Sequence, residues 1–280
     1  MRKRPYYSIR TGKNPNAKLD LELLRKLFCD VYKEFDRKYY FQEAFGITDC
    51  SDVEGSGTLG SDIEAQMTRK LRKKGLWPID AMVFDYSEDD LFDVIEFLHD
   101  VISAPVDGTY HRHCGQTHYK IFDSEIGKRE FKNEINDLLS DYKEGFELSS
   151  DGEILALPEH GMATLMEAVL PSDDPLNVNK RVEAAILKFR RSRSSIEERK
   201  DAIRDLAAVL EFLRPQIKKV LLTQDESDLY NIANNFDIRH HNEKQKTNYD
   251  KNIWLSWMFY YYLATIHAVT RFIKKQNEVL

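Results

Sequence analysis

One uncharged stretch, from Ile253 to Thr270, constrains the fold of this chain more than any other. It runs for eighteen residues without Asp, Glu, Lys or Arg, and it contains Trp254, Trp257 and three consecutive tyrosines. A helix that is apolar on all sides is stable in a water-soluble protein only when it is buried all round. We therefore expect this stretch to be the most buried helix of a helical core, with Trp257 inside that core.

The same stretch is also the only candidate for a membrane span. Its length lies near the lower limit for crossing a bilayer, and Lys274 and Lys275 would flank it on one side. The three tyrosines and His267 would be unfavourable at the centre of a bilayer. We therefore prefer a buried core helix and expect no membrane association.

The overall composition is that of a globular protein. Of the 280 residues 42% are hydrophobic and 31% are charged, which excludes a disordered chain and allows two domains or one large one. The net charge of −6 argues against indiscriminate nucleic-acid binding but leaves room for a local basic patch. Three scattered cysteines (Cys29, Cys50 and Cys114) and the absence of an apolar N-terminal leader predict a cytoplasmic, reducing environment.

Helical spacing of apolar residues recurs through the first half of the chain. It predicts helices over 19–40 and 125–143. A third helix is expected over 62–74, with Ser61 as its N-cap and Glu64 completing a capping box. These segments indicate an α-rich N-terminal domain.

One β-hairpin is predicted within this domain, over 146–157. The pair Asp151-Gly152 forms a tight-turn signal between two alternating apolar runs. A helix followed by such a hairpin resembles the wing of a winged helix. The proline-containing segment 158–179 is interpreted as a linker, so that the N-terminal domain covers 1–170.

The segment 79–107 carries nine acidic residues and neither Lys nor Arg. Its acids begin a helix at 87–90, where negative charge favours a helix N-terminus. The preferred interpretation is a solvated helix face. The alternative is a surface at 80–107 that docks a basic protein partner.

A cluster of metal-binding residue types lies between Tyr110 and Tyr119. It comprises His111, His113, Cys114 and His118. Imidazole and thiolate are good zinc ligands, but this spacing matches no standard zinc motif. We expect a polar turn without a metal ion or cofactor, and zinc binding is the alternative.

The C-terminal region, 180–280, reads as a bundle of four or five helices. The stretch 180–204 is basic, and it includes Arg190 and Arg191. Ser194 or Ser195 can cap the next helix, with two glutamates suited to its first turn. The fold class predicted for the whole chain is therefore mainly α.

A polar segment directly precedes the uncharged stretch. It contains Asn234, Asn235, Asp237, Arg239, His240, His241, Asn242, Glu243 and Lys244. Arginine matches the geometry of a phosphate, and histidine is the usual acid or base near neutral pH. These groups suffice in principle to cleave RNA without a metal ion. The alternative is a polar cap that satisfies helix ends.

This helical half resembles HEPN domains, helical bundles found in bacterial toxins and antiphage effectors. The resemblance rests on the helices from Val182 onward and on NNFDIRHHN before the last helix. The whole chain is similar to bacterial proteins with an AbiJ-type abortive-infection N-terminal region and a HEPN-like C-terminal domain. The matching segments are RPYYSIRTGKNPNAKLDL, GTLGSDIEAQM, DYSEDDLFDVIEFL and RHHNEKQKTNYD.

The resemblance assigns roles to individual residues. HEPN ribonucleases carry an Arg, a polar residue directly after it, and a His a few positions later. Arg239 matches the Arg and His240 the polar position, whereas Lys244, Gln245 and Lys246 stand at the positions where the His is expected. One group of HEPN-like anticodon nucleases instead has a Glu four residues after the Arg and a His far downstream, which Glu243 and His267 match.

The resemblance implies a cytoplasmic antiphage effector that cleaves RNA, with tRNA among the candidate substrates. Arg239, His240, His241, Glu243 and His267 are the expected catalytic residues. RNA would be bound by Asn235, Asn242, Lys244, Arg190 and Arg191. HEPN nucleases pair their motifs across a dimer, so we expect a homodimer through the C-terminal bundle. The alternative is a non-catalytic module that binds RNA, a nucleotide or a protein.

Overall fold

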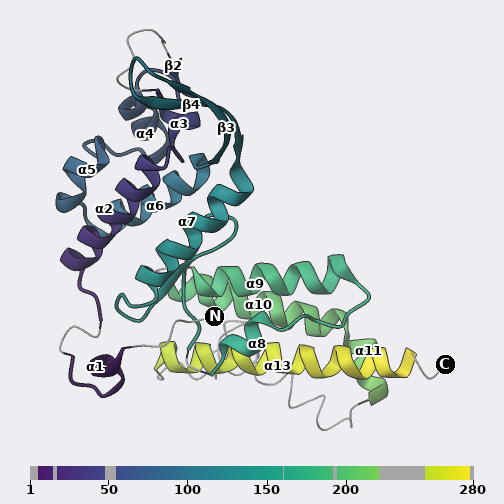
Figure 1. Ribbon diagram of the computed structural model, residues 1–280. Helices are drawn as coiled ribbons and strands as arrows, with labels where there is room; N and C mark the ends of the chain where they lie inside the picture. The colour runs from purple at the N-terminus through teal and green to yellow at the C-terminus, as the bar shows by residue number, and fades with distance from the viewer. Residues whose placement is uncertain are drawn as a thin grey trace. The chain divides into compact units, whose positions relative to one another are not determined.

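The computed structural model describes residues 6–14, 18–47, 55–159, 161–191, 194–220 and 250–277. The chain forms two compact units, Met1–Ala156 and Leu157–Leu280. Helices predominate in both, which confirms the predicted mainly α fold class (Figure 1). Among the described residues, no helix combines the length and apolar character needed to cross a bilayer.

The first unit combines helices with three short antiparallel hairpins. Its helical elements are α1 (Tyr7–Arg10), α2 (Leu21–Arg37), α3 (Gln42–Phe45), α4 (Ile63–Leu71), α5 (Ile79–Met82), η1 (Val83–Asp85), α6 (Glu88–Val101) and α7 (Ser124–Leu139). Its strands are β1 (Gly46–Ile47), β2 (Gly55–Ser56), β3 (Ala104–His111), β4 (Gln116–Asp123), β5 (Phe146–Leu148) and β6 (Ile154–Ala156).

Helices α2, α6 and α7 build the core of the first unit. Leu24, Phe28 and Phe35 recur at helical steps along α2 and are buried, as their spacing predicts. The ring of Phe35 meets that of Phe131 of α7 edge to face, with their centroids 5.4 Å apart. The Asp20 carboxylate begins α2 by accepting a hydrogen bond from the Leu23 amide at 2.8 Å.

The acidic segment is partly balanced within the first unit. Ser87 caps α6 in a capping box with Asp90, in agreement with the predicted acidic helix start. The Lys73 ammonium lies 2.8 Å from a carboxylate oxygen of Asp90 and 2.6 Å from one of Asp93. Part of the negative charge of this segment is thus paired within the unit. Docking of a basic partner at 80–107 stays a prediction.

The start of α4 differs from the sequence prediction. Its N-cap is Asp62, whose carboxylate accepts a hydrogen bond from the Ala65 amide at 2.8 Å, and not Ser61 with Glu64. Adjacent Ser and Asp are both good N-caps, so local sequence alone leaves the starting residue open by one position. The helix ends at Leu71, before Arg72 at φ +59°.

The predicted hairpin of 146–157 is confirmed as β5–β6. Gly152 in its turn has φ +86°, a backbone conformation that favours glycine. The eight-residue strands of the β3–β4 hairpin are a feature that the sequence interpretation missed. Their side chains are mostly half-buried or exposed and show no clean apolar alternation, so the period-two signal of a strand is absent.

The second unit is a helical bundle over its described residues. Its elements are α8 (Ala163–Glu167), the π-helical turn η2 (Pro175–Asn179), α9 (Lys180–Arg190), α10 (Ile196–Phe212), α11 (Arg214–Val220) and α13 (Lys251–Asn277). Ser195 and Glu198 form the capping box that begins α10, one of the two caps expected there. The supposed linker 158–179 belongs to this unit, because Met166, Leu170 and Val178 lie in its core.

Helix α13 is buried on one side only. Phe259 and Leu263 are fully buried, and the Phe259 ring stacks on Phe189 of α9 with the centroids 4.0 Å apart. Trp254 and Trp257, in contrast, are 39% and 42% exposed. The expectation that the helix is buried on all sides is therefore wrong for the side that carries these two tryptophans. Lack of charge does not ensure that every face of a helix is fully buried.

Candidate functional site

Most of the predicted catalytic and RNA-binding residues lie outside the described residues. These are Arg239, His240, His241 and Glu243, together with Asn235, Asn242 and Lys244. The described chain resumes at Asp250, whose carboxylate accepts hydrogen bonds from the amides of Asn252 at 3.0 Å and Ile253 at 3.2 Å. The polar segment thus leads directly into the capped N-terminus of α13.

His267 is a core residue of α13. Its side chain is 5% exposed, and its Nδ1 atom has no hydrogen-bond partner in the described part of the chain. Burial lowers the pKa of His267, and the nearby charge of Arg271 lowers it further. A neutral, buried imidazole does not reach an RNA strand, so its position speaks against the catalytic role that the resemblance assigned to it.

Arg190 and Arg191 stand at the C-terminal end of α9. Arg190 is half-buried and Arg191 is exposed. The charge of Arg191 helps to lower the pKa of Glu198, although the dominant causes are the hydrogen bonds from Ser195. The two arginines mark a basic surface of the second unit, but that surface is partly balanced by acids of α10.

The outer face of α13 forms an uncharged stripe. Trp254, Trp257, Tyr261, Ala264 and Ala268 follow one another at three- and four-residue steps and are exposed or half-buried. The rings of Trp254 and Trp257 meet edge to face at 5.4 Å, and Trp257 stacks on Tyr261 at 5.6 Å between centroids. A continuous apolar surface of this kind is typical of an interaction site.

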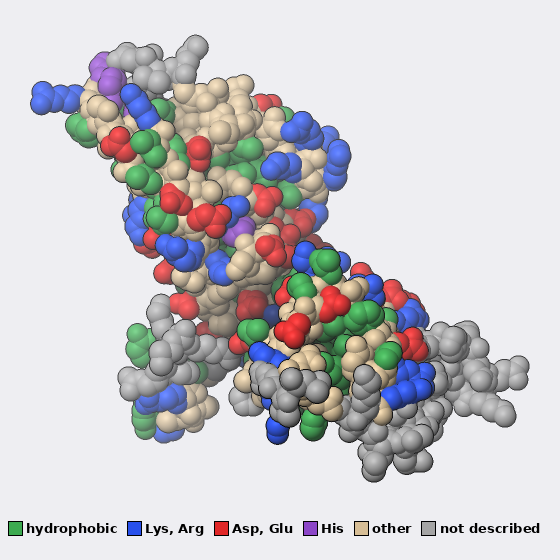
Figure 2. Space-filling view, turned by 90° about the vertical axis from the view of Figure 1, so that its right-hand side faces the viewer, with side chains coloured by type: hydrophobic (Ala, Val, Ile, Leu, Met, Phe, Trp, Pro, Cys, Tyr) green, Lys and Arg blue, Asp and Glu red, His purple; other side chains and the backbone are tan. Residues whose placement is uncertain are grey.

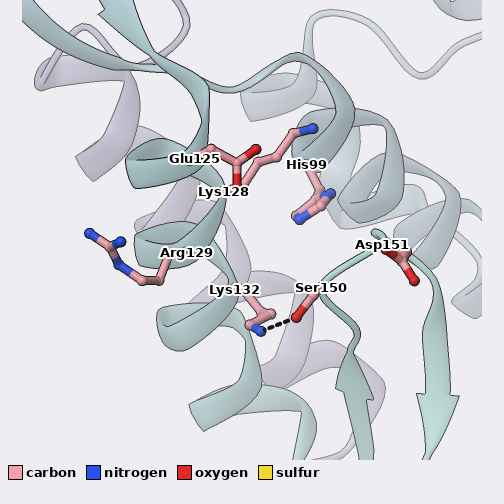
Figure 3. A pocket seen from close by; sticks show the side chains of 7 residues that line it. All are labelled: His99, Glu125, Lys128, Arg129, Lys132, Ser150 and Asp151. Carbon is pink, nitrogen blue, oxygen red and sulfur yellow. Dashed lines mark hydrogen bonds between the residues drawn. The ribbon is translucent and has the colours of Figure 1, made fainter.

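A cavity of about 610 Å³ in the first unit gathers basic side chains between α7 and the β5–β6 turn (Figure 3). Its lining comprises His99, Glu125, Lys128, Arg129, Lys132, Ser150 and Asp151. Lys128 and Lys132 are one helical turn apart on α7, and the Lys132 ammonium donates to the Ser150 hydroxyl at 2.8 Å (Figure 3). Sequence spacing did not single out this cavity, because its residues come from three separate elements.

His99 forms the buried floor of this basic cavity. It is 2% exposed, and neither ring nitrogen has a hydrogen-bond partner among the described residues. Gly152 packs against the ring so closely that a Cβ atom there would lie 2.6 Å from His99 Nδ1. Burial lowers the pKa of His99, with Lys128 acting in the same direction. The positive charge of the cavity therefore comes from Lys128, Arg129 and Lys132.

The histidine and cysteine cluster is partly brought together by the β3–β4 hairpin. His111, Cys114 and His118 offer ligand atoms that all lie within 4.8 Å of one another. His113 does not join this group. The sequence interpretation found the residue types but not their pairing, because that pairing depends on the hairpin.

Comparisons with protein-family models, with curated proteins and with solved structures found no match. The resemblance to HEPN domains and abortive-infection proteins therefore stays a prediction from the sequence.

Proposed function

We propose that the protein is an antiphage effector that cleaves RNA in the cytoplasm, without a metal ion, through its C-terminal unit. The observation that carries this proposal is the uncharged outer stripe of α13, the helix into which the segment with Arg239 leads. Parallel pairing of two copies of this helix would place the two N-termini side by side, and the segment with Arg239 precedes each N-terminus in the sequence. Paired motifs are what the resemblance to HEPN nucleases implies.

The chemistry of cleavage follows from the residue types in the segment. His240 or His241 takes the proton of the ribose 2′-hydroxyl, and a second histidine protonates the leaving 5′ oxygen. Arg239 stabilises the negative charge that develops on the non-bridging oxygens of the phosphorane. Glu243 orients the arginine or supplies a further base. Since one motif offers few groups to hold a phosphodiester in line, two copies complete the site.

The occupant of the outer stripe of α13 is a second copy of the chain. Interface cores are enriched in aromatic residues and depleted of charge, as the stripe is. Ala264 and Ala268 let another helix approach closely beside Trp257. A dimer with two-fold symmetry contains two copies of Arg239 and Lys244, which doubles their positive charge. Arg190 and Arg191 add further positive charge that attracts an RNA backbone.

A charge placed in the stripe is expected to separate the dimer. Ala268→Glu buries an uncompensated carboxylate at the interface and should weaken dimerisation by about a hundredfold, which corresponds to roughly 2.8 kcal/mol. Sedimentation velocity over a concentration series measures the change. Because Ala268 is exposed within one chain, the circular dichroism spectrum should remain that of the wild type.

Gln276→Glu provides the matched control, since it adds the same charge at an exposed position near the end of α13. It should leave dimerisation and cleavage unchanged. A wild-type protein that is monomeric at micromolar concentration, or an Ala268→Glu variant that dimerises normally, would refute the paired arrangement.

A second function, RNA or nucleotide binding without cleavage, is favoured by the basic cavity of the first unit. Lys128 and Lys132 face a space large enough for a phosphate group, with the Ser150 hydroxyl beside them and Glu125 and Asp151 also in the lining (Figure 3). Lysine and arginine are the usual phosphate-binding residues. If the protein binds RNA or a nucleotide without cleaving RNA, the polar segment with Arg239 departs from the usual Arg and His spacing because its cleavage activity has been lost.

The double variant Lys128→Ala/Lys132→Ala is expected to lower the affinity for a labelled single-stranded RNA by about tenfold at low salt, because two phosphate contacts are lost. Fluorescence anisotropy at several salt concentrations measures the loss and its salt dependence. The control Lys26→Ala/Lys120→Ala removes the same charge from exposed positions outside the cavity. Equal affinities of the two double variants would rule out the cavity as the RNA site.

A further inference from the structure

The β3–β4 hairpin places three metal-ligating side chains on one face. His111 pairs with Gln116 across the two strands, and His118 pairs with Thr109. Opposite residues share a face and alternate residues return to it, so His111 and His118 are diagonal neighbours. The turn closes with a hydrogen bond from the Gly115 amide to the His111 carbonyl at 3.0 Å. This closure brings Cys114 back over the two imidazoles.

The two sulfur–nitrogen distances within this group match a tetrahedral zinc site. Cys114 Sγ lies 3.4 Å from His111 Nδ1 and 3.2 Å from His118 Nε2. With Zn–S near 2.3 Å and Zn–N near 2.0–2.1 Å, the sulfur and nitrogen ligands of a tetrahedral zinc ion are roughly 3.5 Å apart. The two imidazole nitrogens lie within 4.8 Å of each other, against roughly 3.3 Å in such a site, so an ion fits once rotation of the imidazoles brings these two nitrogens closer together.

Among the described residues, the hairpin contributes none of its side chains between 105 and 123 to the buried core. Gln42 anchors the middle of the hairpin, where its side chain bonds the Thr117 carbonyl at 3.0 Å and the Tyr119 amide at 2.7 Å. Beyond this anchor the tip projects from the core, and Figure 2 shows histidine side chains at the surface at this end of the first unit. A two-stranded hairpin without a buried face is marginally stable in water.

We propose that His111, Cys114 and His118 bind one Zn²⁺ ion that fastens the tip of the β3–β4 hairpin. The group consists of these three residues in the described part of the chain, so a water molecule or a donor from a binding partner completes the tetrahedron. Cys114 binds as the thiolate and releases its proton to solvent, while both imidazoles bind in the neutral form. Soft sulfur and imidazole ligands select zinc over magnesium or calcium.

This site replaces the expectation that the turn binds no metal. That expectation rested on spacing along the chain, whereas the pairing of the strands decides which side chains meet. The zinc site belongs to the first unit and does not depend on RNA cleavage by the second. It assigns a role to the cluster that the proposed function leaves unused.

The first test is the metal content of the full-length, tag-free protein after equilibration with zinc and desalting. Mass spectrometry should find about one zinc ion per chain in the wild type. Cys114→Ser and His118→Gln should each lower the zinc affinity by at least about tenfold, because a three-ligand site loses one ligand. His113→Gln is the matched control, since it removes a neighbouring imidazole outside the group and should retain zinc.

A second measurement separates a metal site from a misfolded variant. Cobalt in place of zinc should give a thiolate-to-metal charge-transfer band in the wild type and in His113→Gln, but not in Cys114→Ser. X-ray absorption should show one sulfur near 2.3 Å and nitrogens near 2.0–2.1 Å from the zinc. A wild type without zinc, or a Cys114→Ser variant that keeps full zinc affinity, would overturn the proposal.

Discussion

Replacing Arg239 by Ala is expected to abolish RNA cleavage while leaving the protein folded. The guanidinium is the charge that stabilises the developing phosphorane, and removal of one such group typically lowers kcat by about 10² to 10³. Growth of cells that express the wild type or the variant, together with the integrity of their RNA, measures the effect in vivo. Cleavage of tRNA and of total RNA by the purified proteins measures it in vitro.

The matched control for this experiment is Arg271→Ala. Arg271 is an exposed arginine of α13 outside the polar segment, and its removal should leave cleavage unchanged. His241→Ala should reduce cleavage as Arg239→Ala does. Cleavage should also persist in EDTA, because proton transfer by imidazole needs no metal ion.

Cleavage that survives in Arg239→Ala would refute the mechanism that assigns the stabilising charge to Arg239. Loss of cleavage in EDTA that magnesium restores would contradict the metal-independent mechanism while leaving open which residues act. RNA that binds but is never cleaved by the wild type would favour the binding module instead. The zinc proposal is tested by metal content and absorption, so it stands or falls apart from these results.

Replacing Phe259 by Ala is expected to lower the free energy of unfolding by about 3–5 kcal/mol. The Phe259 side chain is 0% exposed, and its ring stacks on Phe189 with an interplanar angle of 12°. Truncation removes buried apolar surface and leaves a cavity between α9 and α13. Urea denaturation followed by circular dichroism measures the loss.

Trp257→Ala is the informative comparison on the same helix. Because Trp257 is 42% exposed, its truncation should cost only about 1–2 kcal/mol at concentrations where the chain is monomeric. The cost should grow with protein concentration if the stripe pairs with a second copy, since dimerisation adds to apparent stability. Equal losses for Trp257→Ala and Phe259→Ala in the monomer would show that both faces of α13 are buried within one chain.

Several features of the fold depend on short stretches of sequence and could be predicted from them. The capping boxes of Ser87 with Asp90 and of Ser195 with Glu198 each use residues three positions apart. The Asp151-Gly152 turn sets the β5–β6 hairpin in the same local way, and the apolar spacing of α2 and α7 marks their buried faces. Such signals act between residues that are close together in the sequence. They therefore do not depend on how the rest of the chain folds.

Only the tertiary structure decided which distant groups meet. The pairing of β3 with β4 brings His118 beside His111, although nothing in the spacing of YHRHCGQTHY requires it. The basic cavity likewise forms because α7 and the β5–β6 turn enclose His99. The exposure of Trp257 follows from which faces of α13 find partners among the other helices. Sequence determines how apolar a helix face is. Whether that face is buried depends on the neighbours that pack against it, and these neighbours come from elsewhere in the chain or from another molecule.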